Sequence, residues 1–174
     1  MTEITIRAAA PGDVAAITRI YADAVLHGTA SFELEPPDDA EMAHRRDALL
    51  IGGYPYLVAE LAGTIAGYAY AGPYRARPAY KWTVEDSIYI SPQFHRRGIG
   101  GRLLARLIVD AEQRGFRQMI AVIGDSAQTA SIAVHAAAGF AMIGTMRSVG
   151  FKHGKWLDTV MMQRALGDGD VTPA

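Results

Sequence analysis

The stretch YISPQFHRRGIGGRLL, from Tyr89 to Leu104, joins a strand-like run to a helix-like run through three glycines. Gly98, Gly100 and Gly101 fall at the first turn of an amphipathic helix predicted from Ile99 to Arg114. The first N–H groups of a helix lack partners and lie at the positive end of its dipole, so they form an anion site. The alternative interpretation is a flexible surface turn.

Charge beside these glycines favours the anion site, since His95, Arg96, Arg97 and Arg102 flank them. Glycine also removes the Cβ atoms that would keep a phosphate away from the backbone. The spacing does not match the dinucleotide fingerprint G-x-G-x-x-G, and the Gly-Lys-Ser/Thr of a P-loop is missing. Neither nicotinamide nor ATP chemistry is therefore favoured.

Outward from this stretch, periodicity predicts one strand, two helices, three strands, a helix, a strand, a helix and two strands. Asp13 is expected to cap the first helix, Ala62-Gly63 to turn a hairpin, and Gly139 to close the last helix. This order predicts a mixed α/β (α+β) sheet in one domain, residues 1–166, followed by a disordered tail, residues 167–174. The expected ranges are strands 3–7, 54–61, 64–75, 82–91, 117–123, 141–151 and 155–163, with helices 14–25, 38–50, 99–114 and 126–138.

Composition narrows the classes of function. The 174 residues are 50% hydrophobic and 20% charged, with a formal net charge of -1, which gives no global basic field for nucleic acid. The absence of cysteine excludes disulfides, cysteine-based metal sites and a cysteine nucleophile. The start lacks a secretory pattern and no apolar run is long enough to span a bilayer. We expect a cytoplasmic protein that uses neither a metal nor a membrane.

The window from His95 to Gly100 resembles the Q/R-x-x-G-x-G/A pyrophosphate loop of the GCN5-related N-acetyltransferases (GNAT), which bind acetyl-coenzyme A. His95 stands where that superfamily usually has Gln or Arg. Other stretches resemble the branch of phosphinothricin and methionine sulfoximine or sulfone N-acetyltransferases, from about Ile4 to Leu166. They include GYAYAGPYRARPAYKWTVEDSIYISP, SIAVHAAAGF and GTMRSVGFKHGKWLDTVMMQ.

The resemblance implies a GNAT fold, with a mostly antiparallel sheet and a splayed central strand pair. It also implies a homodimer that transfers acetyl from acetyl-CoA to the α-amine of a small amino acid or analogue. Because the chain has no cysteine, direct transfer in a ternary complex is preferred over a covalent relay, with a serine relay as the alternative. The resemblance implies two sets of binding residues. The cofactor set is Ile88, Tyr89, Ile90, His95, Arg96, Arg97, Gly98, Ile99, Gly100, Gly101, Arg102, Gln128 and Ser131. The substrate set is Phe32, Arg75, Ala76, Arg77, Tyr80, Glu85, Asp86 and Ser87.

Glu85 and His135 are the candidate catalytic residues. Glu85 is a carboxylate within an apolar strand and matches the catalytic glutamate of the branch, where it would act as base through water; the alternative is a solvated strand face. His135 shares one helix face with Gln128 and Ser131 and would be an acid or a second base; the alternative is a packed or surface histidine. Gln128 stands where the family has Asn.

The acceptor end is suggested by PYRARPAY, in which two arginines follow a strand. The planar guanidinium groups of Arg75 and Arg77 suit a carboxylate such as that of a free amino acid; the alternative is a pair of solvated arginines. Two other functions stay open. One is a peptide or protein N-terminal acetyltransferase, and the other is a coenzyme A-binding module without catalysis.

Overall fold

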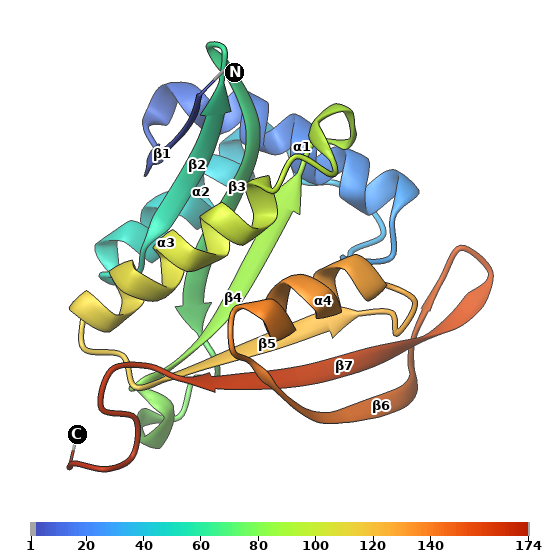
Figure 1. Cartoon of the computed structure of the whole chain (residues 1–174). Helices are drawn as coiled ribbons and strands as arrows, with labels where there is room; N and C mark the ends of the chain where they lie inside the picture. The colour runs from blue at the N-terminus through green and yellow to red at the C-terminus, as the bar shows by residue number, and fades with distance from the viewer. Residues whose placement is uncertain (1–2, 174) are drawn as a thin grey trace.

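The chain forms a seven-stranded sheet with helices on both faces (Figure 1). The computed structural model describes residues 3–173. Its strands and helices are β1 (Ile4–Ala8), α1 (Val14–His27), α2 (Asp39–Ile51), β2 (Tyr56–Leu61), β3 (Thr64–Pro73), β4 (Thr83–Ile90), α3 (Ile99–Gln113), β5 (Gln118–Gly124), α4 (Thr129–Ala137), β6 (Ala141–Lys152) and β7 (Lys155–Ala165). Three short 3₁₀ turns lie at Pro11–Asp13, Pro78–Tyr80 and Pro92–Phe94.

The order of strands and helices predicted from the sequence is confirmed. In space the strands run β1-β2-β3-β4-β5-β7-β6, and every neighbouring pair is antiparallel except β4–β5. The Ala62-Gly63 turn is also confirmed, with φ of 52° and 75° at its two residues, as the two-residue turn of a hairpin requires.

The expectation that Asp13 caps α1 is wrong. Its side chain makes no capping hydrogen bond to that helix. Its Oδ2 instead accepts from the N–H of Ala10 at 2.7 Å and from Arg7 Nη1 at 2.7 Å. Because the 3₁₀ turn Pro11–Asp13 precedes α1, the Asp13 carboxylate accepts hydrogen bonds from residues before the helix and none from its first turn. In α2 the preceding Asp38 does cap the helix, since its Oδ1 accepts from the N–H of Glu41 at 2.9 Å.

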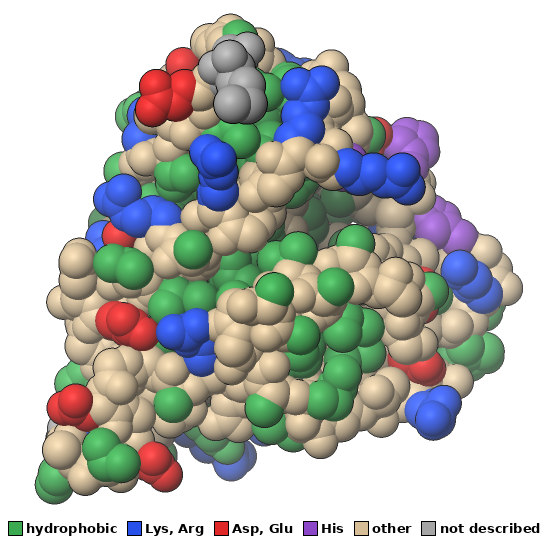
Figure 2. All heavy atoms as spheres, viewed as in Figure 1, with side chains coloured by type: hydrophobic (Ala, Val, Ile, Leu, Met, Phe, Trp, Pro, Cys, Tyr) green, Lys and Arg blue, Asp and Glu red, His purple; other side chains and the backbone are tan. Residues whose placement is uncertain are grey.

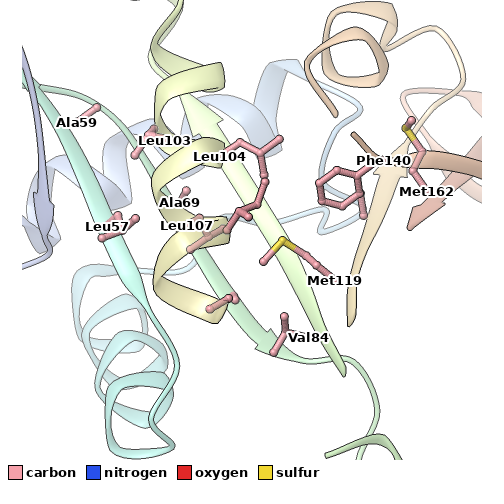
Figure 3. Close-up of a cluster of buried hydrophobic side chains, with 14 of the residues drawn as sticks. Leu57, Ala59, Ala69, Val84, Leu103, Leu104, Leu107, Met119, Phe140 and Met162 are labelled. Carbon is pink, nitrogen blue, oxygen red and sulfur yellow. The ribbon is translucent and has the colours of Figure 1, made fainter. Parts of the chain in front are cut away.

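Each face of the sheet carries its own apolar core. On one face α3 packs its buried stripe against the sheet, with Leu103, Leu104 and Leu107 fully buried beside Val84 and Met119 (Figure 3). On the other face the cluster combines α1 and Met42 of α2 with aromatic residues of β2 and β3. The two cores hold β4 between them, so its alternate side chains enter different environments.

The pairing of β4 with β5 is short. Only Thr83–Asp86 of β4 pair with Gln118–Ala121 of β5. Beyond that point β4 continues against β3 alone, and β5 continues against β7 alone. The two strands therefore separate toward their C-terminal ends, as Figure 1 shows. The splayed central pair expected from the resemblance is confirmed.

Helix α4 sits over this separation and ends as expected at Gly139. The N–H of Gly139 bonds to the carbonyl of Ala136, and the N–H of Phe140 bonds to that of His135, each at 3.0 Å. Gly139 has a φ of 85°. These two bonds and the left-handed glycine form a Schellman C-cap, which fixes where α4 stops above the sheet.

The segment after β7 makes turns in the structure. The side chain of Arg117 donates to the carbonyls of Gly169, at 2.7 Å, and Thr172, at 3.0 Å. The expected disordered tail covers residues 167–174, and residues 167–173 carry these contacts, whereas Ala174 lies outside the described residues. Among residues 3–173, no helix combines the length and the apolar character needed to cross a membrane.

Candidate active site

A pocket lies where β4 and β5 part, beneath α4. Its volume is about 60 Å³, and its walls come from residues 86–89 of β4, residues 121–124 of β5 and three residues of α4 and its N-cap. Figure 2 shows a recess on this face between the start of α3 and α4, with Lys and Arg side chains beside it. Because β4 loses β5 as a neighbour here, its backbone edge from Ser87 to Ile90 has no paired strand on this side and can meet a ligand.

The glycine loop leads directly into this recess at the N-terminus of α3. Gly98 has a φ of 74° and is the N-cap of the helix, so a side chain there would strain the backbone. A Cβ placed on Gly98 or Gly101 would meet nothing within 4 Å. Within residues 3–173 the N–H groups of Ile99, Gly100 and Gly101 donate to no protein acceptor. The predicted anion cradle is thus open.

The cations of this loop differ in what they contact. The side chains of Arg96, Arg97 and Arg102 are exposed around the helix terminus, and the guanidinium of Arg97 lies over the Phe94 ring at 5.6 Å. His95 instead turns back to the end of β4, where its Nε2 lies 3.0 Å from the carbonyl oxygen of Ile90. The arginines are therefore free to meet an anion, while His95 ties the loop to the splayed strand.

Gln128, Ser131 and His135 come together on the wall of the pocket, as their spacing predicts. Gln128 is the N-cap residue of α4. Its Nε2 donates to the hydroxyl of Thr29 at 3.1 Å, and that hydroxyl donates to Asp125 at 2.9 Å. The longer amide at this position thus reaches the loop that follows α1.

His135 lies within hydrogen-bond distance of Asp86 across the pocket. Its Nε2 lies 2.9 Å from Asp86 Oδ2, and the two side chains are 5% and 2% exposed. Its Nδ1 lies 2.7 Å from the carbonyl oxygen of Ser131, one turn earlier in α4. Burial alone would lower the pKa of His135, but the hydrogen bond and charge of Asp86, with the Ser131 carbonyl, raise it above its ordinary value.

Glu85 lies on the opposite face of β4 from this pair, because adjacent strand residues alternate. In the sheet register it stands across from Gly72 of β3. Burial of the carboxyl group, with a further contribution from the charge of Asp86, raises the pKa of Glu85 to about 6. Glu85 is therefore not grouped with His135. The two candidate catalytic residues flank the strand from its two sides.

The loop after α1 reaches the site through Phe32, which is 38% exposed. A Cβ on Gly150 would overlap the Phe32 ring, and one on Gly124 would lie 3.0 Å from the same ring. The buried Lys152 donates to the carbonyl of Ser31 at 2.7 Å. Two glycines and one lysine thus dock the loop on β5 and on the hairpin of β6 and β7.

The arginine segment lies at the other end of β4. Arg75, Ala76 and Arg77 are exposed just after β3, and the Arg75 guanidinium lies over the rings of Tyr74, at 5.2 Å, and Tyr80, at 5.8 Å. This segment precedes Thr83, where β4 begins, whereas the pocket lies at residues 86–89. Within one chain the structure does not bring Arg75 and Arg77 to the pocket.

Two features of the site were not predicted from the sequence. Asp86 was expected to line the substrate site, yet its carboxylate faces His135, 49 residues away in the chain. Lys152 falls between the last two expected strands, although in the structure it ends β6, is buried and holds the loop after α1. Strand alternation could have placed Asp86 on the face of Val84 and Ile88, but no local pattern signals the partner of either residue.

Metal ligation has no support in residues 3–173, where no cluster of three or more His, Asp or Glu side chains is arranged to hold an ion.

A splayed parallel pair in a mostly antiparallel sheet, with an open glycine-rich helix terminus beside it, defines the class of protein. Residues 6–161 match the family model described as "Acetyltransferase (GNAT) domain". The chain belongs to the GNAT acetyltransferase family. The predicted family, fold and enzyme class are confirmed.

Individual relatives agree over almost the whole chain. A phosphinothricin N-acetyltransferase of Alcaligenes faecalis is 53% identical over 97% of this chain and 85% of its own length. An L-methionine sulfoximine/L-methionine sulfone acetyltransferase of Salmonella typhimurium is 40% identical over 95% of this chain and 96% of its own. A crystal structure of a phosphinothricin acetyltransferase from Sinorhizobium meliloti, in complex with acetyl-CoA, superposes with a TM-score of 0.95 at 50% identity, covering 99% of this chain and 93% of that one.

Proposed function

We propose that this protein transfers the acetyl group of acetyl-CoA to the α-amine of a small amino acid analogue, namely phosphinothricin, methionine sulfoximine or methionine sulfone. The pocket in the β4–β5 separation, beside the open start of α3, is the observation that carries this proposal. The names of the relatives supply the acceptor class. In the reaction the amine nitrogen bonds to the thioester carbonyl carbon, the C–S bond breaks, and coenzyme A leaves as its thiol.

The acetyl-CoA diphosphate would bind the N–H groups of residues 98–101, with Arg96, Arg97 and Arg102 supplying charge and His95 holding the loop. The pantetheine arm would pair with backbone groups of Ile88, Tyr89 and Ile90, where β4 has no β5 neighbour. Gln128 and Ser131 would contact the arm from α4, since both line the pocket. This arrangement places the thioester between β4 and α4.

Glu85 would act as the general base, through a water molecule. A pKa of about 6 leaves it mostly ionised at neutral pH and makes it a better proton acceptor than an ordinary carboxylate. His135 would protonate the departing thiolate, because it lies on the pocket wall. The chain contains no cysteine, which favours direct transfer in a ternary complex over a cysteinyl-acyl intermediate.

Arg75 and Arg77 do not line the pocket, so the acceptor would extend beyond it toward the start of β4, where the two arginines, next to Ala76 and Tyr80, would bind its carboxylate. These arginines are exposed and form no salt bridge within residues 3–173. Phe32 and the segment from Glu85 to Ser87 would form the rest of the acceptor site, with the Asp86 side chain directed toward His135. Residues 1–166 would form the acetyltransferase domain, and we place the protein in the cytoplasm, where acetyl-CoA is available.

We also propose that the protein is a homodimer that associates through β6 and β7. Strand β6 is an edge of the sheet. It and the start of β7 expose large apolar side chains, which soluble monomers rarely gather in one place. These are Met142, Ile143, Met146, Val149, Phe151 and Trp156, which are 53%, 59%, 48%, 52%, 57% and 65% exposed.

An acceptor panel tests the proposed function. A thiol-release assay with acetyl-CoA should show turnover with methionine sulfone, methionine sulfoximine or phosphinothricin. The α-amide of methionine sulfone lacks the carboxylate and should have a KM roughly tenfold higher or more, because a charge-assisted bidentate contact is lost. Turnover with peptides alone would instead identify a peptide N-terminal acetyltransferase. Acetyl-CoA binding without turnover on any amine would indicate a non-catalytic module.

Glu85→Gln should lower kcat by about 10² or more, the effect of losing a general base. In the wild type, kcat/KM should rise with pH through about 6, because the base works only when its carboxylate is ionised. This limb should vanish in the variant. Glu3→Gln changes an exposed glutamate outside the site and is the matched control. An unchanged rate in folded Glu85→Gln enzyme would remove Glu85 from the mechanism.

Gly101→Glu should weaken acetyl-CoA binding by about tenfold or more, measured by titration calorimetry, since it brings a negative charge to the proposed diphosphate site. The new side chain meets open space, and Glu is a better helix former than Gly, so folding should not suffer. Ala105→Glu, exposed on the same helix, is the matched control and should bind nearly as the wild type does. Equal affinity in both variants would contradict the proposed cradle.

Sedimentation velocity tests the homodimer. The wild type should sediment at twice the chain mass of 18.7 kDa. A double variant, Phe151→Ser with Trp156→Ser, should sediment as a monomer because both apolar rings leave the proposed contact. Ile51→Ser is the control, since Ile51 is 88% exposed on α2, away from β6 and β7. A monomeric wild type, or a dimer that survives the double variant, would exclude this interface.

A further inference from the structure

Both ring nitrogens of His135 face hydrogen-bond acceptors. The carbonyl oxygen of Ser131 lies 2.7 Å from Nδ1, and Oδ2 of Asp86 lies 2.9 Å from Nε2. A neutral imidazole has one N–H and one lone pair, so it can satisfy only one of these two oxygens. With Asp86 ionised, the other oxygen would meet a lone pair at hydrogen-bond distance. The imidazolium form, which carries an N–H on each nitrogen, then satisfies both oxygens.

The buried carboxylate of Asp86 is stabilised by a neighbouring positive charge. Its side chain is 2% exposed, and His135 is its sole ion-pair partner among residues 3–173. Its second oxygen, Oδ1, is buried and accepts no hydrogen bond from any described residue. An ionised carboxylate buried without a counter-charge is strongly unfavourable. The charge of Asp86 and that of His135 therefore stabilise each other.

The groups around this pair do not supply a competing charge. The Phe140 ring meets the imidazole edge-to-face, with ring centroids 5.1 Å apart. The β5 side of the pocket, residues 121–124, contains Ala, Val, Ile and Gly. From α4 and its N-cap come the hydroxyl of Ser131 and the amide of Gln128, and Glu85 lies on the other face of β4. Asp86 is thus the ionisable group that controls His135.

We propose that Asp86 is a positioning residue that keeps His135 doubly protonated, which makes His135 a proton donor to the leaving group and excludes it as a second base. The donor role rests on the acetyl transfer proposed above. When the C–S bond breaks, the electron pair stays on sulfur, and the Nε2 proton leaves its hydrogen bond to Asp86 and moves to that thiolate. The ring keeps its Nδ1 proton on Ser131. Nε2 is then reprotonated from solvent before the next turnover.

Nuclear magnetic resonance of ring-labelled histidine tests the pair without any substrate. At pH 7, His135 should show two protonated ring nitrogens. It should lose a proton at a higher pH than the histidine of an unstructured peptide in the same buffer, because its pKa is raised above the ordinary value. The His135→Gln variant assigns the signal. A singly protonated His135 at pH 7 would overturn the proposal, whatever the outcome of the acetyl-transfer assay.

Asp86→Asn should lower the proton affinity of His135 by about tenfold or more, because the neutral amide replaces the counter-charge. Asp110→Asn is the matched control: Asp110 is also buried, but it pairs with Arg106 on α3. In the active enzyme, Asp86→Asn should reduce kcat by roughly tenfold or more with little change in KM. It should also lower the pH at which kcat falls on the alkaline side, by the same amount as it lowers the pH at which His135 loses its proton.

An unchanged His135 titration in Asp86→Asn would overturn the role of Asp86. If the titration shifts but no amine is acetylated by the wild type, the pair stands and the proton-donor step falls with the proposed function. If Asp86→Asn does not fold, the wild-type titration still decides the protonation of His135.

Discussion

Strands β4 and β5 share four residue pairs and then diverge, and the other features of the site depend on that short parallel contact. Strand β4 is paired with β3, and β5 is paired with β7. The short β4–β5 contact therefore joins the two halves of the sheet into one. The divergent segment exposes a strand edge that a soluble protein would otherwise have to cover. Helix α3 makes the crossover between these strands, and its open N-terminus lies at the same end of the sheet as the pocket.

The alternation of β4 then separates the two groups for which we propose roles in proton transfer. Glu85 enters the face covered by α1 and α2, where partial burial raises its pKa. Asp86 enters the face covered by α3 and α4, where it meets His135. In the mechanism that we propose, consecutive residues of one strand therefore hold a carboxylate that takes up a proton and a carboxylate that keeps a proton on its neighbour. A single strand between two cores is enough to keep these roles apart.

Much of this fold could be predicted from the sequence because its signals are local. The turn at Ala62-Gly63 and the C-cap at Gly139 each depend on a few adjacent residues, and the stripe of α3 follows helical spacing. The Asp13 prediction failed because the helix N-cap signal competes with a preceding Pro-Gly turn, in which the carboxylate bonds backward.

The parts of the site that could not be predicted depend on contacts between distant segments. The register that brings Asp86 opposite His135 is set by where β4 leaves β5, and no residue pattern encodes that point. The docking of the loop after α1 likewise requires Lys152, 121 residues from Ser31 in the chain. The arginine segment was recognised by its composition, but its distance from the pocket within one chain depends on the topology of the sheet.

The contact between Phe32 and Gly150 has a consequence for redesign of the enzyme. The aromatic ring of Phe32 occupies the space that a methyl group on Gly150 would need, so the size of one side chain limits the size of the other. A smaller side chain at position 32, which we propose to line the acceptor site, would leave a void beside β6, and an alanine at position 150 would fill part of it. Library design aimed at new acceptors should therefore diversify these two sites jointly.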